Sequence, residues 1–384
     1  MNLNTPKLRS RCAAALAGAT ARIAELTAFV GLDGFVDEIL HVVDKRQSAT
    51  AYDRMLTITQ LAERLAGAAG KSTNIEFVPQ LTKLGGNGPI MANALASMGL
   101  HVTYLGNLGY PNLHPVFAEF AQRAAVHSIA QPGFTDAIEF EDGKVMLGKH
   151  TYLKEVNWEN ITTRFGRDRF AAQFRSADLV GFVNWTMLTH MSDIWAAVLQ
   201  EICPTLPTGA KKRTLFFDLA DPEKRTAADI QRALDLILAF RPYFDVILGL
   251  NEKEAYEIAR VLGLDKGDGS RPALAALAAA IHARVPVQTL VVHPVPYALC
   301  VSNGQTQMVE GLYTTQPRLT TGAGDHFNSG FCLGKLLGLE DELALLTGVT
   351  ASGYYVIKSQ SPSVPDLVRA LQHWPAGHTG PYAF

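Results

Sequence analysis

Residues 244–262 read FDVILGLNEKEAYEIARVL, an apolar run followed directly by a helical pattern. The first seven residues, FDVILGL, are almost continuously apolar, which is typical of a strand buried on both faces. In EKEAYEIARVL, charged and apolar residues recur at helical spacing. A buried strand that leads straight into a helix indicates one βαβ unit of a parallel sheet.

Similar units follow one another along most of the chain. We expect buried strands at residues 26–33, 101–107, 178–184, 214–219, 244–250 and 289–293, and helices at residues 89–98, 192–202 and 252–262. The alanine-rich start, interrupted by Arg22, predicts an N-terminal helix rather than a signal peptide. The predicted fold class is α/β, with a doubly wound, mostly parallel sheet flanked by helices.

Two regions interrupt this alternation, residues 34–83 and residues 134–153. The second is built around Asp142-Gly143, a typical hairpin turn. We interpret both regions as strands of a small β-sheet lid, and residues 52–69 as an amphipathic helix inside the first. The chain is then a single domain, 1–384, with lid segments at about 34–83 and 134–153.

Composition limits the partners. Hydrophobic residues make up 48% of the chain and charged residues 18%, with a net charge of −2. No apolar run is long enough to span a bilayer, and no overall positive charge favours nucleic acid. The four cysteines show no paired spacing. We expect a cytoplasmic protein without a nucleic-acid or membrane partner.

Three common site motifs are absent. Gly70-Lys71-Ser72 resembles the end of a P-loop, but Leu65 stands where the first glycine belongs. Gly86-x-Gly88 and Gly322-x-Gly324 both lack the third glycine of a dinucleotide fingerprint. The histidines lack the spacing of zinc ligands.

The stretch RLTTGAGDHFNSGF, residues 318–331, is more informative. Gly322 and Gly324 permit a tight turn, and a helix that begins near Asp325 would present free N–H groups to an anion. The helix dipole would keep the carboxylate ionised at neutral pH, as a base for phosphoryl transfer to an alcohol requires. The alternative is a glycine turn in which the aspartate only caps the helix.

Further motifs favour the first interpretation. LTTGAGDHFNSGF closely resembles the second signature of the ribokinase-like (PfkB) carbohydrate kinase family. LGGNGPIMANALASMGLHVTYLGNLG (84–109) resembles its first signature, and Asn251 with Glu254 matches its NxxE motif. With the acidic strand end GLDGFVDE, the motifs occur in family order over nearly the whole chain, and we identify the chain as a member.

The resemblance implies roles for particular residues. Asp325 would be the general base, and the backbone of Gly322, Ala323 and Gly324 would bind the transferred phosphoryl group. Asn251 and Glu254 would organise Mg²⁺ and its waters, with Asn251 near the nucleotide. Glu254 could instead be an ordinary acid at a helix N-terminus.

On the sugar side, the resemblance implies substrate-binding residues that provide oxygen and amide groups. They are Asp37, Gly86, Asn87, Asp33 and Asn184. Such groups can form paired hydrogen bonds with the neighbouring hydroxyls of a vicinal diol. Trp185 could line the same pocket or belong to the core.

The chain departs from the family pattern in three places. Leu319 replaces an aspartate linked to monovalent-cation activation. His293-Pro294-Val295-Pro296 replaces a Thr-x-Gly turn near the nucleotide, and two of its residues lack an N–H. Phosphates nearby would favour a protonated His293, which could replace part of the lost positive field. Alternatively, His293 only ends a buried strand with one ring nitrogen hydrogen-bonded. The third departure is the insertion at 52–69.

The resemblance implies an ATP-dependent kinase, with Mg²⁺, for a hydroxymethyl group of a sugar or nucleoside. A kinase for a vitamin-like alcohol is a relative within that class. A catalytically silent member that binds a sugar or nucleotide as a sensor is the alternative from another class. The lid could also hold two copies together as a homodimer.

Overall fold

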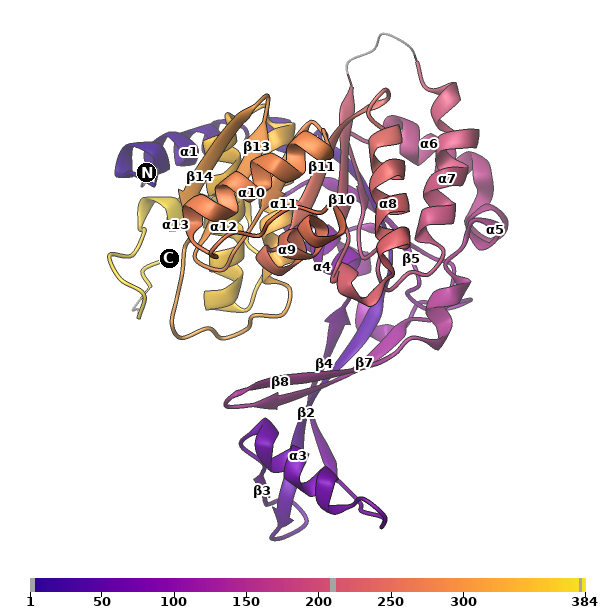
Figure 1. Cartoon of the computed structure of the whole chain (residues 1–384), viewed down its shortest axis with the longest axis vertical. Coiled ribbons are helices and arrows are strands. Elements are labelled where there is room, and N and C mark those ends of the chain that lie inside the picture. The colour runs from indigo at the N-terminus through magenta and orange to yellow at the C-terminus, as the bar shows by residue number, and fades with distance from the viewer. Residues whose placement is uncertain (1–3, 208–211, 380–381) are drawn as a thin grey trace.

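The computed structural model describes residues 4–207, 212–379 and 382–384, and a nine-stranded sheet forms its centre. The strand order is β14-β13-β12-β11-β10-β9-β1-β5-β6 (Figure 1). Neighbours from β12 to β6 pair in parallel, and β13 and β14 add an antiparallel edge. The predicted mostly parallel sheet is confirmed.

The elements have the following bounds. The strands of the large sheet are β1 Thr27–Leu32, β5 His101–Gly106, β6 Ala125–Ser128, β9 Leu179–Phe182, β10 Arg213–Asp218, β11 Phe244–Leu250, β12 Thr289–Val292, β13 Tyr297–Ser302 and β14 Gln305–Glu310; those of the small sheet are β2 Phe35–Arg46, β3 Tyr52–Arg54, β4 Phe77–Gly85, β7 Gly133–Phe140 and β8 Gly143–Lys149. The helices are α1 Pro6–Gly18, α2 Thr20–Ile23, α3 Ile58–Gly67, α4 Asn87–Ser97, α5 Trp158–Asn160, α6 Arg167–Ser176, α7 Met191–Glu201, α8 Ala227–Ala239, α9 Glu252–Val261, α10 Arg271–Arg284, α11 Ala323–Leu336, α12 Asp341–Lys358 and α13 Val364–Gln372. Short helical turns are η1 Pro115–Phe117, η2 Phe120–Gln122, η3 Thr151–Glu155, η4 Ile161–Gly166, η5 Cys203–Thr205 and η6 Pro222–Lys224.

Helices cover both faces of the large sheet. One face buries side chains against α6 to α10, and the other buries them against α1, α4, α11, α12 and α13. The nearly continuous apolar strands are explained by this double coverage. The predicted N-terminal helix is confirmed as α1, which Thr5 caps.

The small sheet extends away from the body as the predicted lid (Figure 1). Its order is β3-β2-β7-β8, with β4 also paired to β2, and Asp142-Gly143 forms the expected hairpin turn between β7 and β8. The predicted helix at 52–69 is wrong in its first part. Residues 52–54 pair with β2 as β3, and the helix begins at Ile58, where Thr57 and Gln60 form a capping box.

Candidate functional site

Polar residues gather where parallel strands of the large sheet end. Asp33 follows β1, Asn184 lies just beyond β9, Asp218 ends β10, and Asn251 follows β11. Carboxyl ends of neighbouring parallel strands meet at one edge of a sheet, which is the usual ligand site of open α/β folds. The lid projects from this same edge.

A cavity of about 310 Å³ lies between the lid and this edge. The lid provides Asp37 and Thr135 among other residues, and the body provides Gly86, Asn87, Asn184, Gly322 and Asp325. We call it the sugar-side cavity. The structure therefore brings together four of the five residues predicted to bind substrate.

Asp33, the fifth, does not line this cavity and lies fully buried behind it. Its carboxylate accepts hydrogen bonds from the Gly88 N–H at 2.8 Å and the Asn184 Nδ2 at 2.7 Å. The Tyr104 hydroxyl donates to its backbone carbonyl. Burial raises the pKa of Asp33 to about 6. The side chain holds the start of α4 and Asn184 in place.

Two lysines that the sequence did not single out lie close to Asp37. Lys83 Nζ is 3.8 Å from the Asp37 carboxylate. Lys144, from the β8 strand of the lid, donates to the Thr321 hydroxyl immediately before the glycine turn. Burial raises the pKa of Asp37, and the charge of Lys83 opposes this. Neither lysine belongs to a recognisable motif, so only the fold could place them here.

The glycine turn and the helix after it have the expected form. Gly322 caps α11 with φ at 99°, a conformation that glycine adopts readily, and Asp325 lies in the first turn. Asn87 Nδ2 donates to Asp325 Oδ1 at 3.0 Å, which joins the two family signatures.

The ionisation of Asp325 differs from the prediction. Burial, helped by the nearby charges of Asp33 and Glu254, raises its pKa to about 8. The carboxyl in this structure is therefore protonated at neutral pH. The expectation of an ionised carboxylate was wrong, because desolvation outweighs the helix dipole.

A second cavity, of about 570 Å³, lies on the other side of the same turn. Ala323 and Gly324 line it, together with Asn251, His293 and Pro294. We call it the phosphate-side cavity. Asn251 and His293, the two residues predicted to lie near the nucleotide, both line this cavity. The start of α11 separates the phosphate-side cavity from the sugar-side cavity.

His293 carries no charge in this structure. Its ring packs against Phe327, with centroids 4.7 Å apart. Burial lowers its pKa to about 4, so the imidazole in this structure is neutral at pH 7. The alternative interpretation, a histidine that only ends a buried strand, describes this geometry, and protonation beside phosphates stays a prediction.

Asn251 and Glu254 form a capping box at the start of α9. Glu254 donates its N–H to Asn251 Oδ1 at 2.9 Å, and Glu254 Oε2 accepts the Asn251 N–H at 2.8 Å. The other oxygen, Oε1, accepts the Asp221 N–H at 2.8 Å. The alternative interpretation, an acid at a helix N-terminus, describes this geometry, and a role toward metal stays a prediction.

Asp218 is a buried carboxylate that we missed. It accepts hydrogen bonds from Asn328 Nδ2 at 2.9 Å and the Ala220 N–H at 2.8 Å. Burial, then the charges of Glu254 and Asp325, raise its pKa well above the usual value. The sequence did offer a signal for this residue, because Asp218 is the single acidic residue of the predicted strand 214–219 and lies near its carboxyl end.

Trp185 belongs to the core, as its alternative interpretation stated. It is fully buried, and its indole N–H donates to the Ser192 hydroxyl at 2.8 Å.

Comparison with known proteins agrees with this geometry. The model of a family described as prokaryotic ketohexokinase matches residues 7–374. The chain belongs to that family. A ketohexokinase from Haloferax volcanii is 31% identical over 343 residues, which cover 89% of each chain. This family member is thus a carbohydrate kinase that phosphorylates a sugar.

Solved structures show the ribokinase fold at low sequence identity. The structure of Arabidopsis thaliana ribokinase complexed with ribose and ATP has a TM-score of 0.60 and 16% identity, over 91% of this chain and 99% of that one. Ribokinase from Cryptococcus neoformans in complex with ADP has a TM-score of 0.59 and 15% identity, over 90% and 98%. Among the described residues, no helix of the ketohexokinase-family protein is long and apolar enough to cross a membrane.

Proposed function

We propose that this protein transfers the γ-phosphoryl group of ATP to a hydroxymethyl group of a ketohexose. The observation that supports this most is that one helix start serves two cavities. Asp325 and Gly322 face the sugar-side cavity, while Ala323 and Gly324 face the phosphate-side cavity. Two ligands bound on either side would meet at this turn, as group transfer requires.

Asp325 would accept the proton of the attacking hydroxyl as the oxygen forms its bond to phosphorus and ADP leaves. Asn87 fixes its Oδ1. The free N–H groups at the start of α11 would stabilise charge on the transferred group. Asp37, Asn87, Asn184 and the Gly86 backbone would bind the other hydroxyls. A cavity of about 310 Å³ suits a monosaccharide.

The buried carboxylates fit a magnesium ion. The charges of Glu254 and Asp325 raise the pKa of Asp218, and that of Glu254 raises the pKa of Asp325, so a divalent cation would relieve this repulsion. Oxygen donors are the ligands that Mg²⁺ prefers. Asp218, and Glu254 and Asn251 through water, would hold the ion, which would neutralise charge on the phosphates when bound.

A panel of acceptors incubated with Mg-ATP tests the proposal. ADP formation above the rate without acceptor is expected with ketohexoses and to a lesser extent with other sugars, nucleosides and vitamin-like alcohols. A silent sensor would bind ligands without ADP formation. Preference for a nucleoside would reject the ketohexose assignment and retain the kinase.

The exposed apolar side chains of the lid favour a homodimer. Leu81 on β4 is 55% exposed and Leu147 on β8 is 47% exposed. Burying such side chains against a second copy would stabilise the pair. We expect the double substitution Leu81→Lys with Leu147→Lys to shift sedimentation from dimer to monomer. Leu113→Lys, at an exposed apolar position outside the lid, is the control, and a monomeric parent protein would contradict the proposal.

A further inference from the structure

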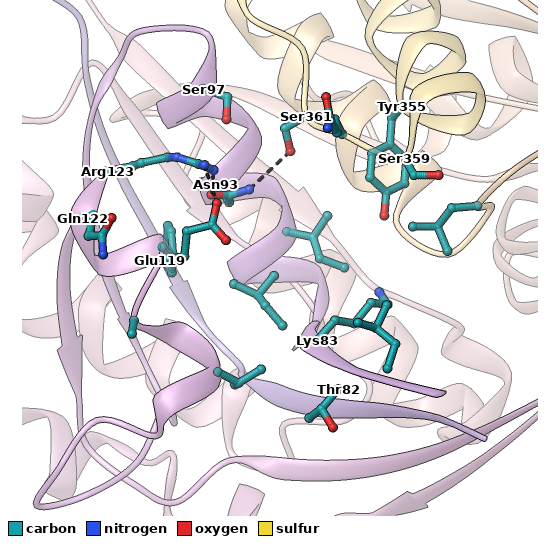
Figure 2. Close-up of a pocket in the computed structure, with 18 of the residues that line it drawn as sticks. Thr82, Lys83, Asn93, Ser97, Glu119, Gln122, Arg123, Tyr355, Ser359 and Ser361 are labelled. Carbon is teal, nitrogen blue, oxygen red and sulfur yellow. Dashed lines mark hydrogen bonds and ion pairs between the residues drawn. The ribbon is translucent and has the colours of Figure 1, made fainter. Parts of the chain in front are cut away.

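A third cavity, of about 1030 Å³, lies beside the site (Figure 2). It is bordered by α4, by β4, by residues 115–123, and by the residues that follow α12. Polar side chains from these segments, among them Asn93, Ser97, Arg123 and Ser361, line it together with His326 of α11 and Tyr355 of α12. The proposed catalytic steps use none of these groups.

Hydrogen bonds lead from this cavity to the glycine turn. Arg123 Nη1 donates to Asn93 Oδ1 at 3.2 Å, and Asn93 Nδ2 donates to the Ser361 hydroxyl oxygen at 3.3 Å. His326 then joins the two sites, with Nε2 2.9 Å from Ser361 Oγ and Nδ1 2.7 Å from the Gly322 carbonyl oxygen. Figure 2 shows Asn93 between Arg123 and Ser361.

The direction of the last two bonds follows from chemistry. A carbonyl oxygen only accepts, so His326 Nδ1 must carry a proton. Burial lowers the pKa of His326 to about 4, so the neutral ring has a single N–H and Nε2 accepts from the Ser361 hydroxyl. Every group from Arg123 to Gly322 therefore donates to the next, and such chains reinforce their members.

Another residue that lines the third cavity, Tyr355, binds the residue before Gly322. The Tyr355 hydroxyl donates to the Thr321 carbonyl at 2.9 Å, and its ring stacks on His326 with centroids 3.7 Å apart. Two consecutive carbonyls of the turn that leads into α11 are thus fixed from the third cavity. A ligand that moves Ser361 or Tyr355 would move the amides proposed to bind phosphate.

The lining indicates the class of ligand. Hydroxyl and amide groups, which can both donate and accept, outnumber charges, and Arg123 is already paired with Glu119. Such groups match the hydroxyls of a carbohydrate. The cavity is about three times the size of the sugar-side cavity, so it would admit more than a monosaccharide.

We propose that this cavity is a second binding site for a neutral, polyhydroxylated ligand of about disaccharide size, coupled to the glycine turn through Ser361 and His326. The coupling rests on the proposed function, since it assumes that the turn binds ATP. The existence of the second binding site does not depend on that function.

Binding is tested by saturation-transfer NMR with trehalose as the neutral probe and trehalose 6-phosphate as the charged one. Ser97, the last residue of α4, faces the cavity, so Ser97→Phe should abolish trehalose binding. Ser176→Phe, at the exposed end of α6, is the matched control and should leave binding unchanged. No trehalose binding, or equal binding by Ser97→Phe, overturns the site. Binding of the phosphate ester alone overturns the neutral class.

Coupling is tested by titrating trehalose with and without a non-hydrolysable ATP analogue. We expect the analogue to change the trehalose Kd about five-fold, and trehalose to change the analogue's Kd by the same factor. Ser361→Ala should still bind trehalose but lose this effect. Equal affinities with and without bound analogue in the parent protein overturn the coupling. An analogue that does not bind at all counts against the proposed kinase mechanism and leaves the binding test intact.

Discussion

The two cavities on either side of the α11 start differ in what their walls offer a ligand. The sugar-side cavity has carboxylates and amides from the lid, α4 and the end of β9. The residues that line the phosphate-side cavity include no carboxylate; they provide hydroxyl groups, the Asn251 amide and two prolines, Pro294 and Pro317. Sugar hydroxyls are recognised by particular side chains, whereas phosphate can be held by backbone N–H groups of a turn. Side-chain substitutions should therefore affect the two sides unequally.

The largest expected effect is that of Asp325→Asn. Loss of the proton acceptor should lower kcat about 10²- to 10³-fold, while the fold and sugar binding persist. Asp168→Asn is the matched control, because Asp168 also lies in the first turn of a helix, α6, but is exposed. Single-turnover kinetics and sugar titration provide the measurements. An unchanged rate of the chemical step would remove Asp325 from the role of base.

The pH profile sharpens the same assignment. The base must be ionised and its pKa in the free protein is about 8, so kcat/KM should rise with pH through that value. The pKa of the Asp325 carboxyl is higher in the folded than in the unfolded protein. Its contribution to the stability of the folded state is therefore lost as the pH rises from the unfolded-state pKa toward 8. The melting temperature of Asp325→Asn should therefore exceed that of the parent increasingly between pH 5 and pH 8. A flat rate profile over this range would contradict the assignment of Asp325 as the base, and a constant difference in melting temperature would contradict its raised pKa.

Glu254→Gln is expected to have an intermediate effect. The amide cannot accept both backbone hydrogen bonds, and it removes a charge from the proposed magnesium site. Half-maximal activity should require about ten-fold more Mg²⁺, with the sugar KM unchanged. Glu252→Gln, in the same helical turn of α9, is the control. Full activity in EDTA would eliminate the metal role.

The smallest effect is expected for His293→Ala. The neutral ring provides packing against Phe327 rather than charge, so its loss should raise the KM for ATP about three-fold and leave the sugar KM unchanged.

Because Leu319 cannot coordinate a cation through its side chain, rates in K⁺ and Na⁺ should be equal at constant ionic strength. Strong K⁺ activation would show that a cation site persists there.

The sequence predicted the parallel sheet, the lid and the glycine turn because each depends on local patterns. FDVILGL predicts a buried strand whatever its neighbours are, and Gly322 must turn where few other residues can. Lys83 and Lys144 could not be found, since their roles arise only when the lid meets the body. The ionisation of Asp325 was mispredicted because burial depends on the whole fold.

Two glycines at the entry to the lid have a consequence for mutational tolerance. A Cβ at Gly85 would lie 2.3 Å from the Asp37 carboxylate, and one at Gly133 would lie 2.5 Å from the Phe35 ring. Both neighbours line the sugar-side cavity. A deep mutational scan should therefore show two narrow intolerant positions flanked by lid strands that accept many residues. Drift in natural sequences would be confined in the same way, leaving the outer lid free to diverge while its entry stays fixed.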